Sequence, residues 1–402
     1  MRASPSAQRP PPRRQPTSWP DKWCEWPYEA GFQALSYPFR VRASTVQAGE
    51  MVERLLGHLR ADSAVGPTYS LSDRGGSSGR VGLRVDGRPI PSLNAPEAFR
   101  RMLWHVLSAT TRERDRVLLH AAAVRWADGA VLLPGGSSAG KTVLAAALVR
   151  AGFAYLADEV AAVDPQTTAV QPLPTALTVH GDALDDGLAG LRPQLSHELR
   201  RFIDGRWPLR PEDIRADAVG RPTPLRWVVI PVYRPGAATR TVPLDRGDAV
   251  ALLAGHVLNR PTPADPDGDP LVRALAGARC YRLETGALQP AVEAVHALVE
   301  RPPRPTAGQS RSNDPPDGEI VTIPERIVVS PGGGRVRHGS FSGGEVVRPG
   351  TQVGWLQQSG ATLPLVAGVH GTFLSWLAWD GLRVLPGQPL ARLRCDRRGM
   401  TR

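Results

Sequence analysis

The sequence predicts an α/β domain built around a P-loop, preceded by a small α/β region and followed by an all-β module. Three observations support this. An apolar run enters a segment matching G-x-x-x-x-G-K-[ST] at 135–142, and an alanine-rich helical segment that ends at Gly152 follows it. A Pro- and Ser-rich stretch then separates this region from the C-terminal part. That last part repeats its glycines at a fixed shift and has no helical period.

These signals divide the chain into five segments. We expect a disordered basic tail at 1–18, a small α/β accessory domain at 19–112, a P-loop domain at 113–300, a Pro-rich linker at 301–320 and an all-β domain at 321–396. The tail contains arginines and prolines without an apolar run, which is typical of disorder and not of a secretory signal.

The distribution of the net charge of +11 argues against a nucleic-acid partner. Residues 1–16 hold four arginines and no acid, and residues 301–402 hold thirteen arginines and seven acids, which leaves +1 on residues 17–300. A nucleic-acid groove would concentrate positive charge on the folded core. We also expect no membrane partner, because no apolar run reaches the ~18 residues that a membrane span needs.

The cysteines indicate a reducing compartment. Cys24, Cys280 and Cys395 lie far apart and follow neither a disulfide nor a metal-binding spacing. We therefore expect a cytoplasmic protein.

The accessory region alternates extended and helical patterns without obvious chemistry. Short alternating runs predict strands at 38–44 and 69–74, and a hairpin at 81–90 turning at Asp86-Gly87. Apolar residues at three- and four-residue spacing predict helices at 46–62 and 95–114.

The P-loop region has the succession of strands and helices that the motif requires. We predict strands at 117–126, 130–136, 153–163 and 225–233, and helices at 141–152 and 288–300.

Each residue type in the P-loop serves phosphate binding. Glycines let successive backbone N–H groups point inward at phosphate oxygens, and the following helix adds its positive N-terminal dipole. The lysine would reach the β- and γ-phosphates of ATP, and the hydroxyl of Thr142 would hold Mg²⁺. The nucleotide-binding residues predicted in this way are Gly135, Gly136, Ser137, Ser138, Ala139, Gly140, Lys141 and Thr142.

Lysine usage supports this interpretation. Lys22 and Lys141 are the only lysines among 49 basic residues, so a chance match to a lysine-containing motif is rare. Lys141 lies in the P-loop, where a compact ammonium suits phosphate binding better than a planar guanidinium.

Two further positions are candidates for the same site. Asp158 and Glu159 end the strand predicted after the P-loop helix, and adjacent parallel strands bring their carboxyl ends to one ligand-binding edge. Acids there either bind Mg²⁺ and accept a proton, or form a solvated turn. His120 precedes the P-loop strand and is either part of the site or a packed core histidine.

The segment 118–163 resembles the catalytic core of HPr serine kinase/phosphorylase, whose wider class includes phosphoenolpyruvate carboxykinase. The shared pattern is a histidine, a hydrophobic strand, the Gly-rich loop, a helix and a strand ending in paired acids. His120 stands 21 residues before Lys141 and Asp158 stands 17 after it, as in that family. The resemblance implies Asp158 as the general base, Glu159 as a neighbouring Mg²⁺ or hydrogen-bonding acid, and His120 as a catalytic-site residue. It also implies ATP and Mg²⁺ as cofactors.

The C-terminal part contains an internal repeat. With a shift of 37 residues, 328–356 aligns on 365–393 without a gap. Gly334 matches Gly371 and Gly344 matches Gly381, which predicts two similar β-halves that share one apolar seam. Trp376 and Trp379 are candidates either for its core or for a contact surface.

This repeat resembles the biotinyl/lipoyl carrier domain, a barrel-sandwich hybrid of two quasi-symmetric halves. In that family the modified lysine lies eight residues before the position held here by Gly368. Gly360 occupies that place, and residues 321–396 contain no lysine. Attachment needs an amine, so we expect neither biotin nor lipoate. The domain is predicted to dock a partner, to dock onto the P-loop domain of the same chain, or to serve as a structural appendage.

Together these inferences predict an enzyme, a Mg·ATP-dependent kinase that phosphorylates a Ser or Thr hydroxyl on a protein or peptide. A small-metabolite kinase, an ATP-binding regulatory scaffold that docks a partner through 321–396, and a biotin-dependent carboxylase fragment are the alternatives. Homo-oligomer formation stays open at this stage.

Overall fold

The computed structural model of the chain describes twelve stretches of residues. They are 25–73, 81–91, 94–136, 139–259, 269–300, 325–341, 344–358, 360–376, 378, 380–381, 383–384 and 389–395. The predicted tail at 1–18, the predicted linker at 301–320, and Cys24, Ser137, Ser138 and Trp379 lie outside the described residues.

The N-terminal region is a five-stranded sheet with two helices. Its elements are β1 (Tyr28–Ala34), β2 (Tyr37–Ala43), α1 (Val46–Leu56), the 3-10 turn η1 (Gly57–Leu59), β3 (Thr68–Asp73), β4 (Val81–Val85), β5 (Arg88–Ile90) and α2 (Ala95–Thr110). The strands lie in the order β1-β2-β3-β4-β5. Burial alternates along β1 and β2, so one face of the sheet is apolar, and the buried faces of α1 and α2 join it in one cluster. The strands predicted at 38–44 and 69–74 and the hairpin at 81–90 are confirmed. The two helices begin where predicted but end earlier, at Leu56 and Thr110, and β1 was not predicted.

Thr45 and Asn94 explain where these two helices begin. Each side chain accepts a hydrogen bond from the backbone N–H three residues later, which satisfies one of the free donors of the first turn.

The central region has more elements than the sequence predicted. They are β6 (Val117–Leu119), β7 (Ala121–Trp126), β8 (Gly129–Pro134), α3 (Lys141–Arg150), β9 (Ala154–Ala157), β10 (Ala161–Val163), β11 (Ala169–Gln171), β12 (Leu177–His180), α4 (Gly181–Asp185), α5 (His197–Arg200), β13 (Arg206–Leu209), α6 (Pro211–Ile214), β14 (Thr223–Tyr233), β15 (Arg240–Leu244), α7 (Arg246–Ala254), α8 (Pro270–Ala274), β16 (Arg279–Thr285) and α9 (Leu288–Glu300).

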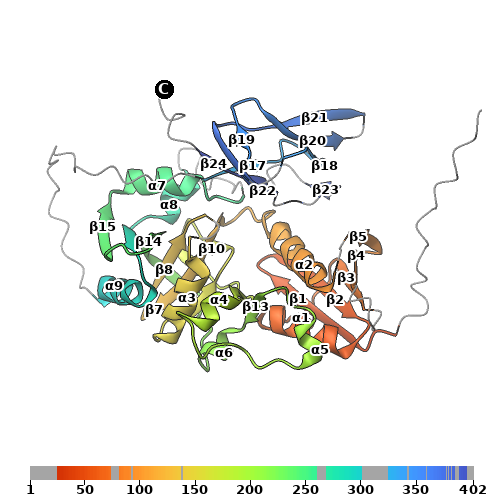
Figure 1. Ribbon diagram of the computed structural model, residues 1–402, viewed down its shortest axis with the longest axis horizontal. Helices are drawn as coiled ribbons and strands as arrows, with labels where there is room; N and C mark the ends of the chain where they lie inside the picture. Colours follow the sequence, from red (N-terminus) through yellow and green to blue (C-terminus); the bar gives the residue numbers. More distant parts are fainter. Residues whose placement is uncertain are drawn as a thin grey trace, which may run out of the picture.

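A mixed nine-stranded sheet runs through this region in the order β6-β10-β11-β14-β8-β7-β9, and β16 joins β14 to β15. An apolar cluster that contains α3 and α9 covers one face, and the cluster shared with the N-terminal region covers another part of the sheet. The core of the N-terminal region is therefore continuous with that of the central region (Figure 1).

Two predicted strands are broken, and both breaks matter for the site. The run 117–126 divides at His120 into β6 and β7, and the run 153–163 divides at Asp158-Glu159-Val160 into β9 and β10. Since β6 pairs with β10 and β7 pairs with β9, the two breaks lie opposite each other.

The prediction that the strands on either side of the P-loop helix, β8 and β9, are neighbours is wrong. The strand β7 lies between them and is antiparallel to both. The two strands still run in the same direction, so their carboxyl ends meet at one edge.

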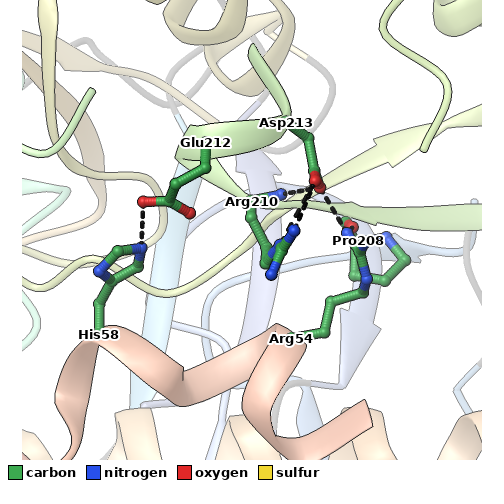
Figure 2. A network of polar contacts seen from close by, with 6 residues as sticks. All are labelled: Arg54, His58, Pro208, Arg210, Glu212 and Asp213. Carbon is green, nitrogen blue, oxygen red and sulfur yellow. Dashed lines mark hydrogen bonds and ion pairs between the residues drawn. The ribbon is translucent and has the colours of Figure 1, made fainter. Parts of the chain in front are cut away.

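Polar contacts attach α1 to the short helix α6 (Figure 2). The guanidinium of Arg54 is paired with the carboxylate of Asp213 and donates to the carbonyl of Pro208 at 3.1 Å. His58 lies 2.6 Å from Glu212, and Arg210 lies 3.0 Å from Asp213. Arg54 and Asp213 are only 11% and 13% exposed, so this pair is largely shielded from water.

The C-terminal module consists of β17 (Glu325–Val329), β18 (Gly334–His338), β19 (Val346–Val347), β20 (Gln352–Gln358), β21 (Ala361–Val366), β22 (Gly371–Trp376), β23 (Arg383–Val384) and β24 (Pro389–Cys395). They form two four-stranded sheets, β17-β24-β22-β19 and β21-β20-β18-β23, that share one apolar cluster. With the shift of 37 residues, each strand of the first half has a counterpart in the second. Each sheet takes two strands from each half.

The module packs on the N-terminal region through α2. Trp104 of α2 and Ile90 of β5 join the apolar cluster of the module, and Figure 1 shows the module, in blue, beside α2. Among the helices of the described residues, none is long and apolar enough to cross a membrane.

Candidate nucleotide site

The described part of the Gly-rich loop leads from β8 into the first turn of α3. Gly140 caps this helix with φ of +79°, in the left-handed region that glycine adopts without strain. Lys141, only 7% exposed, donates from Nζ to the carbonyl of Gly136 at 2.8 Å. The ammonium group therefore bends back over the loop, where it also faces the cavity described below.

Thr142 connects the loop to β9. Its hydroxyl lies 2.9 Å and 3.1 Å from the two carboxylate oxygens of Asp158, to which it donates. Asp158 is 2% exposed and follows the last residue of β9. The two residues meet because β8 and β9 run in the same direction through the sheet.

His120 and Glu159 form a second pair beside the first. His120 Nε2 lies 3.2 Å from Glu159 Oε2, and the backbone N–H of His120 donates to the carbonyl of His256 at 2.8 Å. Because His120 stands at the break between β6 and β7, directly across from the break between β9 and β10, its side chain reaches the acid. Glu159 keeps 52% of its side chain exposed, since it faces the cavity.

The two adjacent acids differ in protonation. Burial raises the pKa of Asp158 to about 7, and the negative charge of Glu159 adds to this effect, while Thr142 and Lys141 oppose it. Burial would also raise the pKa of Glu159, but its hydrogen bond with His120 and the charges of Lys141 and Arg392 lower it to about 2. Asp158 is therefore able to take up a proton near neutral pH, while Glu159 stays ionised.

The histidines of the site are neutral. Burial lowers the pKa of His120, and the charges of Lys141 and Arg392 act in the same direction against the opposing effect of Glu159. Burial also lowers the pKa of His256 to about 4. We therefore assign His120 as the N–H donor to the ionised carboxylate, which has only acceptors.

A cavity of 760 Å³ extends from the P-loop to α2 and the C-terminal module. Pockets that bind small ligands commonly have volumes of about 300–1,000 Å³. Its lining comes from four parts of the chain: Gly140, Lys141, Thr142, His120 and Glu159 from the predicted site; Arg101, Trp104, Leu107 and Ser108 from α2; Thr178, His180 and Arg206 from the β12–β13 hairpin; and His338, Trp376, Ala378, Asp380 and Arg392 from the C-terminal module.

Three polar groups of this lining have no hydrogen-bond partner among the residues that the structure describes. They are Trp104 Nε1, Ser108 Oγ and Trp376 Nε1. Ser108 is 8% exposed. Buried donors without a partner are costly in a folded protein and are expected where a ligand satisfies them. The indole ring of Trp376 is also held flat on the imidazole of His338, with 4.0 Å between ring centroids.

The structure brings together Lys141, Thr142, Asp158, Glu159 and His120. Thr142 contacts Asp158, whereas Glu159, the acid predicted as a metal ligand, contacts His120. No cluster of three or more His, Cys, Asp or Glu side chains suited to a metal ion occurs within the described ranges.

Sequence reasoning missed the walls contributed by α2 and the C-terminal module. Trp104, Ser108 and Arg392 belong to no motif. The sequence contained one indication of these walls, the pair Trp376 and Trp379 predicted as core or contact surface. Trp376 does line the cavity.

Comparisons with known proteins give remote structural similarities. No model of a protein family matches the chain, and no curated protein matches it in sequence. Among solved structures, the HPr(Ser) kinase/phosphatase from Coxiella burnetii matches 45% of this chain and 95% of its own, with 13% identity and a TM-score of 0.25. An aspartoacylase family protein from Mesorhizobium loti matches 73% of this chain and 97% of its own, with 15% identity and a TM-score of 0.22.

A single-chain, multi-domain long-chain acyl-CoA carboxylase also matches. The match covers 22% of this chain with 21% identity and a TM-score of 0.18, and it spans only 9% of the carboxylase. All three TM-scores are low, so the function is argued below from the residues of the site.

Proposed function

We propose that the chain is a Mg·ATP-dependent kinase that phosphorylates a Ser or Thr hydroxyl on a protein or peptide. The observation that carries the proposal is the contact between Thr142, which lines the cavity beside Lys141, and the buried carboxylate of Asp158 directly behind it. It joins the residues expected to bind the phosphates to the acid expected to take the acceptor's proton.

The chain's own groups account for nucleotide binding. The N-terminus of α3 and the glycines before it offer backbone N–H groups and a positive dipole to phosphate oxygens. Lys141 adds a buried ammonium group. It donates to the carbonyl of Gly136 in this structure and would donate to a phosphate oxygen instead when the nucleotide is bound. The unpartnered donors of Trp104, Ser108 and Trp376 supply further hydrogen bonds inside the cavity.

The donor set fits Mg²⁺. The Thr142 hydroxyl and the ionised Glu159 carboxylate are hard oxygen donors that both line the cavity, and Mg²⁺ at phosphates is commonly held by one or two protein oxygens together with phosphate oxygens and water. When bound there, the ion would neutralise charge on the phosphates. Asp158, which accepts from Thr142, is then left as the base.

In the proposed transfer, the acceptor oxygen forms a bond to the γ-phosphorus and the bond from that phosphorus to the β–γ bridging oxygen breaks. The hydroxyl proton passes to Asp158, and the electron pair of the broken bond stays on ADP. Lys141 stabilises the charge that develops on the transferred group, and Asp158 orients the hydroxyl.

Binding and transfer are tested separately. Titration calorimetry with Mg·ATP should show binding that is lost in Lys141→Ala and kept in Arg150→Ala, a control on the exposed end of the same helix. Transfer of labelled phosphate to an array of Ser- and Thr-containing peptides should then be lost in Asp158→Ala while ATP affinity stays within about threefold of the original. If the unaltered chain has no Mg-dependent affinity for ATP, the proposal fails.

The shared cavity also favours a second candidate, an ATP-dependent scaffold. Because the C-terminal module forms part of the cavity wall, a bound nucleotide would contact the module directly. This candidate predicts that neither the unaltered chain nor Asp158→Ala transfers phosphate to a peptide, although both bind ATP.

A further inference from the structure

Arg392 is part of the C-terminal module and lines the same cavity as Lys141. It lies in the middle of β24, which pairs with β17 on one side and β22 on the other. Its neighbours Ala391 and Leu393 are 0% and 1% exposed and belong to the module's core. Because side chains alternate along a strand, Arg392 leaves the opposite face, away from the module's core.

Arg392 shares one cavity with the residues of the P-loop end. Lys141, Thr142, His120 and Glu159 line the same 760 Å³ space that Arg392 lines from β24. A phosphate held at the N-terminus of α3 would therefore lie in the same space as the guanidinium.

The cavity lining carries more basic than acidic residues, and this stays true when Arg100, which is paired with Asp204, and Arg101 are left out with their acids. The basic residues that line it are Arg100, Arg101, Lys141, Arg206 and Arg392, and the acids are Glu97, Glu159 and Asp380. Of the acids, Glu97 is paired with Arg101, and Asp380 is paired with Arg337. A guanidinium suits phosphate because its planar array of N–H groups matches two phosphate oxygens at once.

We propose that Arg392 contacts the terminal phosphate of ATP, so that the C-terminal module completes the nucleotide site and allows it to distinguish ATP from ADP. This inference rests on the proposed function of the P-loop and assigns part of that site to the carrier-like domain. The module then has a role in the chain's own chemistry without any covalently attached group.

The proposal has a specific thermodynamic consequence. A residue that touches only the terminal phosphate contributes to ATP affinity and contributes nothing to ADP affinity. Lys141, in contrast, is expected to serve both nucleotides because a P-loop lysine also reaches the β-phosphate. By linkage, ATP should tighten the contact between the module and the P-loop region more than ADP does.

The test is calorimetric titration of the full chain with Mg·ATP and with Mg·ADP. Arg392→Ala is expected to weaken ATP binding about tenfold or more, the effect of losing one charge-assisted hydrogen bond, and to leave ADP binding within about twofold. Arg392→Lys should recover part of the loss. Arg394→Ala is the matched control, because Arg394 lies two residues along the same strand, is exposed and does not line the cavity.

Each outcome has a distinct meaning. Equal weakening of ATP and ADP, or no change in either, would overturn the role of Arg392. If the unaltered chain binds neither nucleotide, the P-loop proposal itself fails. Arg392→Gln, which keeps most of the side chain's length, repeats the comparison if Arg392→Ala unfolds at a lower temperature than Arg394→Ala.

Discussion

The hydroxyl of Thr142 donates to the carboxylate of Asp158, with 2.9 Å and 3.1 Å to its two oxygens. This contact joins the first turn of α3 to the end of β9. In Thr142→Ala the carboxylate loses its donor, and Mg-dependent transfer should fall by about tenfold to a hundredfold. Thr142→Ser keeps the hydroxyl and should retain most of the activity. Phosphotransfer rates at saturating Mg²⁺ measure both, and equal rates for the two variants would contradict the role of the hydroxyl.

A close backbone approach shapes the cavity wall inside the C-terminal module. A Cβ at Gly354 would lie 2.4 Å from the carbonyl oxygen of Arg337 and 2.7 Å from the indole of Trp376, whereas a Cβ at Gly368 would meet nothing within 4 Å. We expect Gly354→Ala to lower the stability of the module by about 1–3 kcal/mol and to displace Trp376, and Gly368→Ala to have little effect. Chemical denaturation followed by tryptophan fluorescence compares the two; equal midpoints would argue against this packing.

Two hydroxyls of α2 differ in their partners. Thr110 donates to the carbonyl of Leu107 at 2.6 Å, but the hydroxyl of Ser108 finds no partner in the described part of the chain. Ser108→Ala should therefore keep or raise the stability of the nucleotide-free chain by about 0.5 kcal/mol, since alanine favours the helix and no bond is lost. Thr110→Ala should lower it by about 1 kcal/mol. Thermal unfolding is the measurement, and a destabilised Ser108→Ala chain would mean that this hydroxyl is satisfied.

The shielded ion pair in Figure 2 should matter more than an exposed one nearby. Arg54 and Asp213 are 11% and 13% exposed, while Arg60 and Glu53 are 46% and 35% exposed. Arg54→Ala leaves Asp213 with only Arg210, and we expect a loss of about 1–3 kcal/mol, against less than about 1 kcal/mol for Arg60→Ala. Urea denaturation of both variants checks the difference. A larger loss for Arg60→Ala would contradict it.

A buried histidine makes stability depend on pH. Burial lowers the pKa of His105 to about 4, and its Nδ1 lies 2.6 Å from the hydroxyl of Tyr69. The unfolded chain takes up a proton near pH 6.5 and the folded chain only near pH 4, so the full contribution is present above pH 6.5 and is lost as the pH falls towards 4. The loss reaches at most about 3 kcal/mol.

Replacement of this histidine gives the corresponding control. His105→Leu should flatten the dependence of the unfolding free energy on pH between 6.5 and 4, while His256, whose pKa is also lowered to about 4, retains part of the slope. An unchanged slope in His105→Leu would show that another group causes it. Denaturation midpoints measured at several pH values are sufficient for this comparison.

The local features of the fold could be predicted from the sequence because they depend on local patterns. The helix at 288–300 matches α9 because its apolar period is strong, and Asp86-Gly87 turns between β4 and β5 because such a pair favours a hairpin. The two acids predicted the end of β9 at Ala157, but the break at His120 and the new strand β10 after the acids could not be predicted, since both runs are apolar on either side. They arise from strand pairing, which is a tertiary property.

The proximity of part of the candidate site follows from the motif and its spacing. Thr142 contacts Asp158, and Lys141 lies beside Thr142 in the first turn of α3, whereas the function of these residues stays a prediction. The contributions of Trp104 and Arg392 depend on how the C-terminal module packs on α2, and no local pattern encodes that packing. The sequence also could not distinguish Asp158 from Glu159. Their different pKa values depend on the burial of Asp158 and on the hydrogen bond between Glu159 and His120, which only the folded structure shows.

Each sheet of the C-terminal module contains strands from both halves of the repeat, and this limits which truncations the module tolerates. Neither four-stranded sheet survives the removal of one half, because each would keep only two of its strands. Proteins shortened at either end of the repeat should therefore lose the whole module at once, with no stable half-sized remnant.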